Sequence, residues 1–437
     1  MKPHELLRIM KAVYGLLNAP REWNRSLCEF LVSDGWRQNK LDQCLFEWIE
    51  HDEVTGHLGL HVDDVLCTGR GESFDSALER LKTRFRFGTW ENAQEKPIMY
   101  CGCEIAQGAD FSIRVRQTEY CSSVHEIPLS QERRSNPQDA ISQEERTQMR
   151  QRLGALNWRA TQTAPWLLAT VSVLQGCVEQ GVVADLLAVN KLVRLHRKHA
   201  EEGLFFPSFE GECTIVTFCD ASWATRKDSS SQGGQVTLLM RRDVLQGARV
   251  PFHVLSWTSK RLKRVCRSST AAETQMAANA LDTHEFVKLA WYHSCNVELK
   301  LGDTDKYLCR IPSCMVCDAK NVYDGVVTVQ TSGLKMEEKR TALELLAIRE
   351  RLGQAAVSLR WVNSDQELAD GMTKPWRHED LIKALRLAEW RIVYDPAYQS
   401  ARRVRALKKG RSSDEFEALV CLLELMQSQA TKDFGPM

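Results

Sequence analysis

Four short acidic segments in the second half of the chain carry the residues best suited to chemistry. Each contributes one carboxylate that follows an apolar run or stands early in a helix-like run: Asp220, Glu273, Asp318 and Asp370. Carboxylate oxygens are the ligands that Mg²⁺ prefers, and two such ions can hold the attacking and leaving oxygens of a phosphodiester. If folding brings the four carboxyl groups within about 8 Å of one another, they predict a two-ion Mg²⁺ or Mn²⁺ site and a metal-dependent nuclease.

Alternating strand-like and helix-like segments must position these carboxylates. The pattern changes at Gly211, after which apolar periodicity predicts the order βββαβαβ. The expected strands are 214–220, 235–240, 252–257, 315–318 and 358–362, and the expected helices are 268–293 and 336–352. Strands interleaved with helices favour an α/β sheet with some parallel pairing. Asp370 is expected on a C-terminal helix, and Asp324 and Asp365 are interpreted as cap or surface residues.

The first 125 residues predict a separate mixed α/β unit. Helical spacing covers residues 22–34 and ends at Gly35, and a second helix is expected over 73–87. Strands are expected at 45–49, 57–62, 98–105 and 111–116. Residues 61–66 read as a hairpin whose tip is formed by Asp63 and Asp64. We expect these two aspartates at the surface, with no third strand-borne acid facing them.

The middle and the end of the chain read as helical or polar. Residues 129–145 predict a linker or helix-capping loop, and two helices follow at 144–175, with a break near Pro165, and at 184–200. A basic tail and an amphipathic helix over 413–427 come after Pro375. The tail contains six basic residues, Arg402, Arg403, Arg405, Lys408, Lys409 and Arg411.

Composition limits the class of protein. The chain has 437 residues, 43% of them hydrophobic, which suffices for two or three domains with real cores. Because the charges of 58 basic and 57 acidic residues nearly cancel, any binding of nucleic acid must come from local patches of positive charge. The 15 cysteines suit reduced thiols in an intracellular compartment, and we interpret Cys314 and Cys317 as core residues rather than as zinc ligands. The most apolar stretch, residues 164–178, is too short to span a bilayer.

Motifs along residues 11–375 together resemble a known family. Residues 11–16 with 19–23 are similar to K-A-L-Y-G-L-K-Q-A-P-R-x-W, and residues 60–64 to a Y-V-D-D hairpin. Residues 100–105 with 117–120 are similar to F-L-G-I-E-I followed by Q-x-x-Y, and residues 153–158 are similar to G-S-L-x-Y. The four acidic segments are similar to D-A-D-W, S-S-T-E-A-E, a D-N segment and A-D-x-L-T-K-P, and a segment at 256–260 is similar to S-W-x-S-K. This series resembles the C-terminal part of the Pol polyprotein of copia-type LTR retrotransposons.

The resemblance implies a division of the chain and an activity. It implies an α+β palm-like reverse transcriptase fragment at 1–125, a thumb- or connection-like helical segment at 126–205, a ribonuclease H-like mixed sheet with flanking helices at 206–378, and a basic, helical extension at 379–437. It implies hydrolysis of the RNA strand of RNA–DNA hybrids, with Asp220, Glu273, Asp318 and Asp370 as metal ligands. Other parts of the polyprotein become expected partners, and a cytoplasmic retroelement particle or the nucleus becomes the expected location.

Departures from the family's motifs leave alternatives open. In this family a further catalytic aspartate lies upstream of the first motif, and the chain starts after it, so Asp63 and Asp64 alone are expected not to support polymerisation. Leu17, Asn18 and His61 also replace the family's residues. The chain could instead be an inactive relic that binds nucleic acid or a partner, or part of a full polymerase whose front half comes from another chain or was lost to gene-model error.

A basic run between the third expected strand and the following helix contains the candidate nucleic-acid-binding residues. It comprises Lys260, Arg261, Lys263, Arg264 and Arg267. These residues would bind backbone phosphates without reading sequence, although a solvated basic loop has the same composition. Specificity for RNA would come from contacts to 2′-hydroxyl groups. Trp223 and Trp257 could stack on bases, but core packing is the expected role of both.

Overall fold

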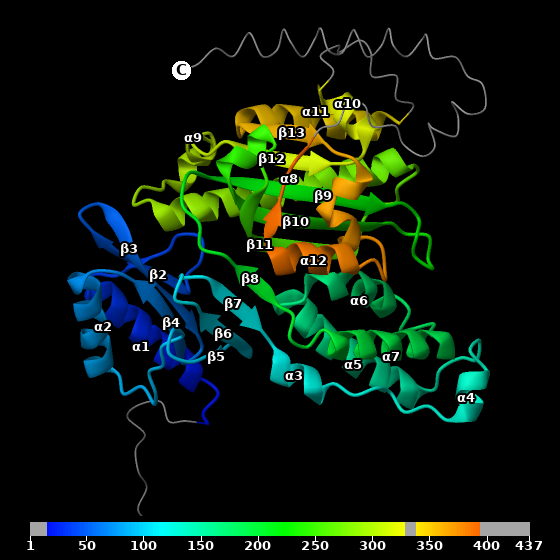
Figure 1. Ribbon diagram of the computed structural model, residues 1–437, viewed down its shortest axis with the longest axis horizontal. Helices are drawn as coiled ribbons and strands as arrows, with labels where there is room; N and C mark the ends of the chain where they lie inside the picture. The colour runs from blue at the N-terminus through cyan, green and yellow to red at the C-terminus, as the bar shows by residue number, and fades with distance from the viewer. Residues whose placement is uncertain (1–14, 328–337, 394–437) are drawn as a thin grey trace, which may run out of the picture. The chain divides into compact units, whose positions relative to one another are not determined.

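The computed structural model describes residues 15–327 and 338–393 (Figure 1). Within these ranges the chain is a mixture of helices and antiparallel and parallel strands, which confirms the α/β class expected from the sequence. The predicted helix at 413–427, the basic tail and residues 11–14 of the first motif lie outside the described residues. No helix among the described residues has the length and apolar character needed to cross a membrane.

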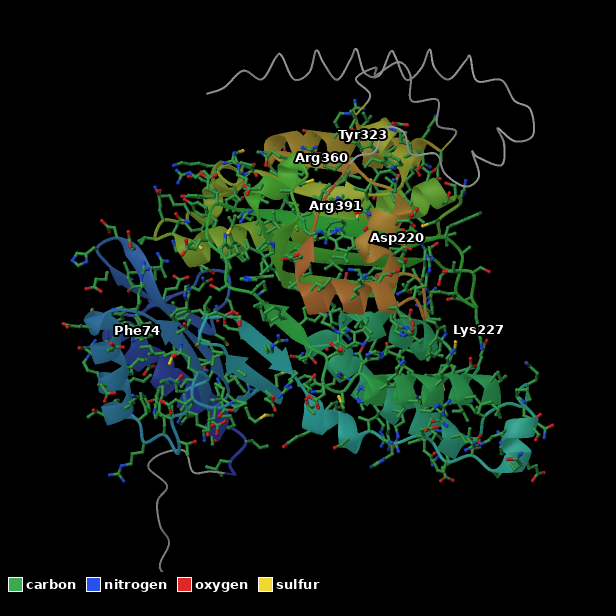
Figure 2. All side chains as sticks on the ribbon, viewed as in Figure 1. Phe74, Asp220, Lys227, Tyr323, Arg360 and Arg391 are labelled. Carbon is green, nitrogen blue, oxygen red and sulfur yellow. The ribbon has the colours of Figure 1, made fainter. Side chains whose placement is uncertain are left out.

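The first unit is a four-stranded antiparallel sheet with two helices. Its strands follow one another in order: β1 (Arg37–Gln38), β2 (Leu45–Glu50), β3 (Glu53–His61) and β4 (Asp64–Gly69). The helices are α1 (Ala19–Ser33) and α2 (Glu72–Arg84), close to their predicted bounds. Leu27, Leu58, Phe74 and Leu81 are buried in the core that these elements share, and Figure 2 labels Phe74 within it. Gly35, at φ 103°, lets the chain turn after α1 into the sheet.

The predicted hairpin at 61–66 is present, but its tip differs from the prediction. His61 pairs with Asp64, so the two-residue turn consists of Val62 and Asp63, and Asp64 is the first residue of β4. Val62 takes φ 56°, a conformation that a β-branched residue rarely adopts. The sequence therefore gives no signal for a turn at Val62 and Asp63. Asp63 and Asp64 are both exposed.

A second small sheet corrects the strand expected at 98–105. That stretch is a hairpin of β5 (Ile98–Tyr100) and β6 (Cys103–Gln107), turned by Cys101 at φ 50° and Gly102 at φ 71°. Positive φ at both central residues is typical of a tight two-residue hairpin turn, and cysteine gives no sequence signal for it. The sheet continues through β7 (Ile113–Arg116) to β8 (Leu204–Phe206), a strand that the sequence did not suggest.

A helical segment lies between β7 and β8 in the chain. It contains α3 (Thr118–Ser123), α4 (Gln131–Ser135), α5 (Gln143–Gln162), α6 (Leu168–Gln175) and α7 (Val183–Lys198). The break expected near Pro165 is a short 3-10 turn over Pro165–Leu167. The predicted capping loop is confirmed at Ser142, whose hydroxyl accepts from the Glu145 amide while the Glu145 carboxylate accepts from the Ser142 amide.

The largest sheet has six strands in the order β13-β12-β9-β10-β11-β14. The antiparallel strands β9 (Cys213–Ser222), β10 (Gln232–Arg241) and β11 (Val250–Arg261) come first, and β12 (Ser313–Cys317) and β13 (Val357–Trp361) then add in parallel beside β9. With helices α8 (Ser269–Cys295) and α11 (Lys339–Gln354), this reproduces the predicted βββαβαβ order. Additional elements are α9 (Thr304–Leu308), α10 (Lys320–Val327), α12 (Glu379–Leu387) and β14 (Glu389–Trp390).

Two cores cover the two faces of this sheet. On one face α8, α10 and α11 bury Cys219, Met315 and Cys317. On the other face α6, α12 and part of the helical segment share a single core with Phe218 and Val316. The alternation of neighbouring residues between the cores follows from the period of two in a strand. The described part of the predicted 379–437 extension therefore packs on the sheet, since α12 belongs to the second core and β14 pairs with β11.

Candidate metal centre

Asp220 and Asp318 lie at the same level of two neighbouring parallel strands. Phe218 of β9 pairs with Val316 of β12. Asp220 lies two residues after Phe218, and Asp318 lies two residues after Val316. Their side chains consequently leave the same face of the sheet at the carboxyl end of these strands. Asp220 is buried within β9 (Figure 2), and Asp318 is half-buried in the turn after β12. The Ser364 hydroxyl donates to the Asp318 carboxylate at 2.7 Å.

Glu273 reaches the two aspartates from α8. The helix begins after Ser268, whose hydroxyl accepts from the Ala271 amide at 3.1 Å, and Glu273 stands in its first two turns. One oxygen each of Glu273, Asp220 and Asp318 all lie within 4.8 Å of one another. Three of the four predicted carboxylates therefore converge from three separate elements.

Asp370 is not a member of that three-carboxylate group and is joined to it through lysine. It lies on a short 3-10 turn, Leu368–Met372, rather than on the helix expected from sequence; α12 starts only nine residues later. The Lys374 ammonium pairs with the Asp370 carboxylate and lies 3.9 Å from that of Asp220. Arg377 binds the other Asp370 oxygen at 2.9 Å.

Burial makes the ionised carboxylates unfavourable when no cation is present. It raises the pKa of Asp220, Glu273 and Asp318, and repulsion among the three raises the pKa of Asp220 and Glu273 further. Lys374 opposes the shift because its positive charge favours the ionised forms. Close carboxylates with raised pKa values are the arrangement that a bound cation relieves.

The structure adds residues that the sequence reasoning did not single out. Glu367 is 4% exposed, its Oε1 accepts from the Ala369 amide at 3.0 Å, and its Oε2 has no partner among the described residues. Burial and then Asp318 raise the pKa of Glu367. The Thr373 hydroxyl donates to Asp220. Both residues lie three positions from Asp370 in the sequence, and only that short separation could have pointed to them.

The donor set fits a hard divalent cation. Mg²⁺ binds oxygen ligands at about 2.1 Å, so opposed ligands on one ion are about 4 Å apart. The 4.8 Å limit on the oxygens of Asp220, Glu273 and Asp318 is close to that span, and small side-chain movements would close the difference. The orphaned Oε2 of Glu367 adds a further buried oxygen nearby. Within the described residues this is the single cluster of three or more such ligands.

The predicted basic run covers the end of β11 and the loop that follows it: Lys260 and Arg261 are the last two residues of the strand, and Lys263, Arg264 and Arg267 lie between the strand and α8. Lys260, Lys263 and Arg267 are exposed and have no ion-pair partner within the described residues. Arg261 pairs with Asp228 at 3.2 Å, and Arg264 pairs with Glu344.

The two tryptophans near the site differ from each other. Trp223 is 46% exposed, against the core packing expected of it, because it lies just past β9. Its indole donates to the Cys266 carbonyl at 2.8 Å and so ties the basic loop to the strand of Asp220. Trp257 packs against the core and donates to the Ala160 carbonyl at 2.9 Å, as expected.

The remaining candidates do not belong to the carboxylate cluster. Asp63 and Asp64 join no cluster of three ligands within the described residues. Asp324 pairs with Lys320 at 3.0 Å on the exposed side of α10, in agreement with its interpretation as a surface residue. Cys314 and Cys317 are free and buried in the cores on opposite faces of the sheet, so they cannot share a zinc ion.

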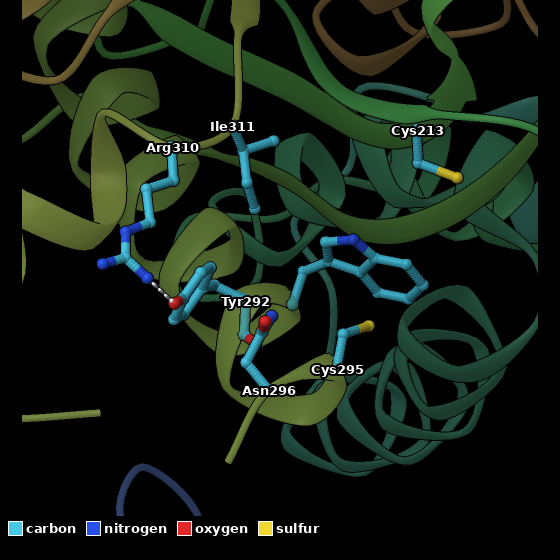
Figure 3. Close-up of a pocket in the computed structure, with 7 residues that line it drawn as sticks. Cys213, Tyr292, Cys295, Asn296, Arg310 and Ile311 are labelled. Carbon is cyan, nitrogen blue, oxygen red and sulfur yellow. Dashed lines mark hydrogen bonds between the residues drawn. The ribbon is translucent and has the colours of Figure 1, made fainter. Parts of the chain in front are cut away.

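A pocket of about 380 Å³ lies at the other end of α8 (Figure 3). Trp291, Cys295 and Arg310 are among the residues that line it. About 20 residues of helix separate it from Glu273, which corresponds to roughly 30 Å. This pocket therefore does not belong to the carboxylate cluster.

Comparison with known proteins agrees with the resemblance read from the motifs. Residues 1–132 match the family described as reverse transcriptase (RNA-dependent DNA polymerase). Two retrovirus-related Pol polyproteins from Arabidopsis thaliana, from transposons RE1 and RE2, are 24% and 25% identical over 86% of this chain. The chain spans 24% of the length of each. It is related to the Pol polyproteins of copia-type retrotransposons.

Two of the solved structures with some likeness to this chain are a reverse transcriptase and a ribonuclease H. A foamy viral protease-reverse transcriptase in complex with an RNA/DNA hybrid is 11% identical over 80% of this chain and 39% of its own, with a TM-score of 0.40. RNase H1 from Halobacterium salinarum is 13% identical over 36% of this chain and 93% of its own, with a TM-score of 0.25.

Proposed function

We propose that this chain is a divalent-metal-dependent nuclease that hydrolyses the RNA strand of RNA–DNA hybrids. The observation that carries the proposal is the convergence of Asp220, Glu273 and Asp318 within 4.8 Å at the carboxyl end of β9 and β12. The order of the sheet, with three antiparallel strands followed by two parallel ones, is the order expected for a ribonuclease H-like domain. The relationship to Pol polyproteins supports a nucleic-acid substrate.

In this proposal the carboxylates bind the metal ions, and neighbouring side chains orient them or adjust their charge. Asp220, Glu273, Asp318 and Asp370 would hold two Mg²⁺ or Mn²⁺ ions. The bound ions would supply an activated water and stabilise the negative charge that develops on phosphate and on the leaving 3′ oxygen. Thr373 and Ser364 orient the aspartates through their hydroxyl groups. Lys374 keeps the pKa of Asp220 from rising further, which favours the ionised form that a metal ligand needs.

Substrate would be held by the end of β11 and the loop between β11 and α8. Lys260, Lys263 and Arg267 are exposed and free to bind phosphates, and Trp223 fixes the loop beside the strand of Asp220. Arg261 and Arg264 would have to exchange their carboxylate partners for phosphate. Contacts to 2′-hydroxyl groups would select the RNA strand.

The reverse transcriptase part is not expected to polymerise by itself. Asp63 and Asp64 are exposed and no third carboxylate accompanies them in the described residues, whereas a two-metal polymerase site needs more ligands. Other parts of a polyprotein would be partners that complete it. The described cysteines are all free thiols, which suits a reducing compartment such as the cytoplasm, where a retroelement particle would assemble, or the nucleus.

A second candidate function is binding without catalysis. The observation that favours it is the pairing of Lys374 with Asp370, because an internal ammonium can neutralise carboxylates in place of a metal. In that case the chain would bind hybrid or a partner and leave it intact.

Cleavage of an end-labelled RNA–DNA hybrid distinguishes the two functions. We expect the chain to cut the RNA strand in Mg²⁺ or Mn²⁺, and Asp318→Asn to reduce the rate at least about 100-fold while hybrid binding is retained, because a metal ligand is lost but the basic loop is not. Asp324→Asn is the matched control, since Asp324 is an exposed aspartate outside the cluster. Intact hybrid in both metals, with normal binding, would establish the binding function instead.

A further inference from the structure

Three residues on neighbouring strands form a row under the segment that carries Asp370. Asp220 of β9 pairs with Gly234 of β10, and Gly234 pairs with Ser259 of β11, so all three face the same side of the sheet. The acidic segment, residues 367–374, crosses this row. At one end the Thr373 hydroxyl donates to Asp220, and at the other the Ser259 hydroxyl donates to the Met372 carbonyl.

Gly234 allows the acidic segment to approach the sheet. A methyl group added at Gly234 would lie 2.5 Å from Cβ of Met372 and 2.9 Å from its carbonyl carbon and oxygen. Two of these atoms belong to the backbone, which cannot rotate away as a side chain would. The segment therefore lies directly on the backbone of β10.

A chain of buried hydrogen bonds connects Ser259 with helix α6. Gln232 is fully buried, and its amide nitrogen donates to the hydroxyl oxygens of Ser259 at 2.7 Å and Ser172 at 3.1 Å. Its amide oxygen accepts from Arg226, whose guanidinium also donates to the Ser172 carbonyl at 3.0 Å. We name Ser172, Arg226, Gln232 and Ser259 the anchor network.

A second contact from α6 holds the chain just after the acidic segment. The Trp376 amide donates to the Thr170 hydroxyl at 3.2 Å. Helix α6 can serve as a fixed support because Val171 and Leu174 are buried in the same core as Val236 of β10. Asp370 and Lys374 thus belong to a stretch of chain that α6 holds directly at Trp376 and, through Gln232 and Ser259, at Met372.

We propose that Gln232 and Ser259 are positioning residues that couple helix α6 to the metal centre. They act through the Met372 carbonyl, and they fix the acidic segment so that Asp370, Thr373 and Lys374 meet Asp220. This inference rests on the proposed metal site. It adds that the helical segment helps to position the metal ligands, since Ser172 and Thr170 come from α6.

Two variants test the anchor network by removing hydrogen bonds at nearly constant volume. In Gln232→Met and Ser259→Ala we expect the Kd for Mn²⁺, measured by titration calorimetry on the full chain, to rise about tenfold, as for a buried polar group left unpaired. Amide hydrogen exchange of Thr373 and Lys374, whose amides donate to the Asp370 carbonyl at 3.2 and 3.1 Å, should become at least about tenfold faster. Ser259→Thr retains the hydroxyl and should restore both values.

The control is Ser256→Ala, on the same strand, because Ser256 has no side-chain hydrogen bond within the described residues. Loss of stability alone would lower the melting temperature without changing Mn²⁺ affinity in the folded protein. Unchanged Mn²⁺ affinity and unchanged exchange of Thr373 and Lys374 in both Gln232→Met and Ser259→Ala would overturn the proposal. Neither readout needs hybrid cleavage. A wild-type chain that binds Mn²⁺ but does not cut hybrid would refute the proposed function, and the two variants would still test this inference.

Discussion

At the scale of single residues, the clustered carboxylates lower the stability of the metal-free protein once they ionise. Asp220 is buried, and its folded pKa is raised from 3.8 to about 7, first by burial and also by Asp318. An acid whose folded pKa lies above its unfolded pKa binds more protons in the folded state. The metal-free protein therefore loses stability as pH rises from about 4 to about 7.

Asp220→Asn should reverse part of this loss. In EDTA at pH 8 we expect the variant to be more stable than the wild type by about 1 kcal/mol or more, the value of one pKa unit, and the difference should vanish near pH 4. Denaturant unfolding at the two pH values measures it. A variant that is less stable than the wild type at pH 8 would show that the ionised Asp220 carboxylate does not destabilise the folded protein.

At the scale of elements, the capped start of α8 sets the position of Glu273. The Ser268 hydroxyl accepts from the Ala271 amide, and loss of such a cap costs about 1 kcal/mol. We expect Ser268→Ala to lower stability by that amount and to slow hybrid cleavage several-fold, because Glu273 lies in the first two turns. Ser269→Ala, at an exposed position one residue later, is the control for unfolding and cleavage assays. Equal cleavage by the two variants would contradict the role given to the cap.

Elements with strong periodicity could be predicted from the sequence, and those defined by unusual backbone angles could not. The three strands before α8, and the Ser268 cap itself, follow from apolar spacing and side-chain chemistry. The hairpin at Cys101 and the turn at Val62 depend on positive φ at residues that seldom adopt it. The 3-10 turn of Asp370 depends on tertiary contacts with Gly234 and Ser259, which no local pattern contains.

At the scale of the whole molecule, a nearly neutral chain should bind nucleic acid through one local patch. With a net charge of +1, the three residues of the basic run that have no ion-pair partner among the described residues, Lys260, Lys263 and Arg267, should dominate phosphate contact. Three contacts predict a slope of about −3 for the logarithm of hybrid affinity against the logarithm of salt concentration. Replacing all three by alanine should flatten the slope by about 2 to 3 in filter-binding assays. A slope that stays unchanged would place the nucleic-acid interface elsewhere.

Three of the four carboxylates that the sequence singled out, Asp220, Glu273 and Asp318, converge in the structure, whereas Asp370 is connected to them through Lys374. Their actual geometry could not be predicted from the sequence, since it depends on the parallel register of β9 and β12 and on the position of Lys374. The link from α6 to the acidic segment was equally hidden, because Ser172 and Gln232 are 60 residues apart in the chain.

The origin of the oxygen added during cleavage tests the central claim most directly. Hybrid should be incubated with the chain and Mn²⁺ in water enriched in oxygen-18, and the RNA products analysed by mass spectrometry. Attack of water on phosphorus with departure of the 3′ oxygen predicts one oxygen-18 atom on a 5′-phosphate and a 3′-hydroxyl on the other fragment, with product formed at least about 100-fold more slowly by Asp318→Asn. Unlabelled products that end in 2′,3′-cyclic phosphate, or labelled products formed equally by Asp318→Asn, would contradict a metal-dependent hydrolysis at this site.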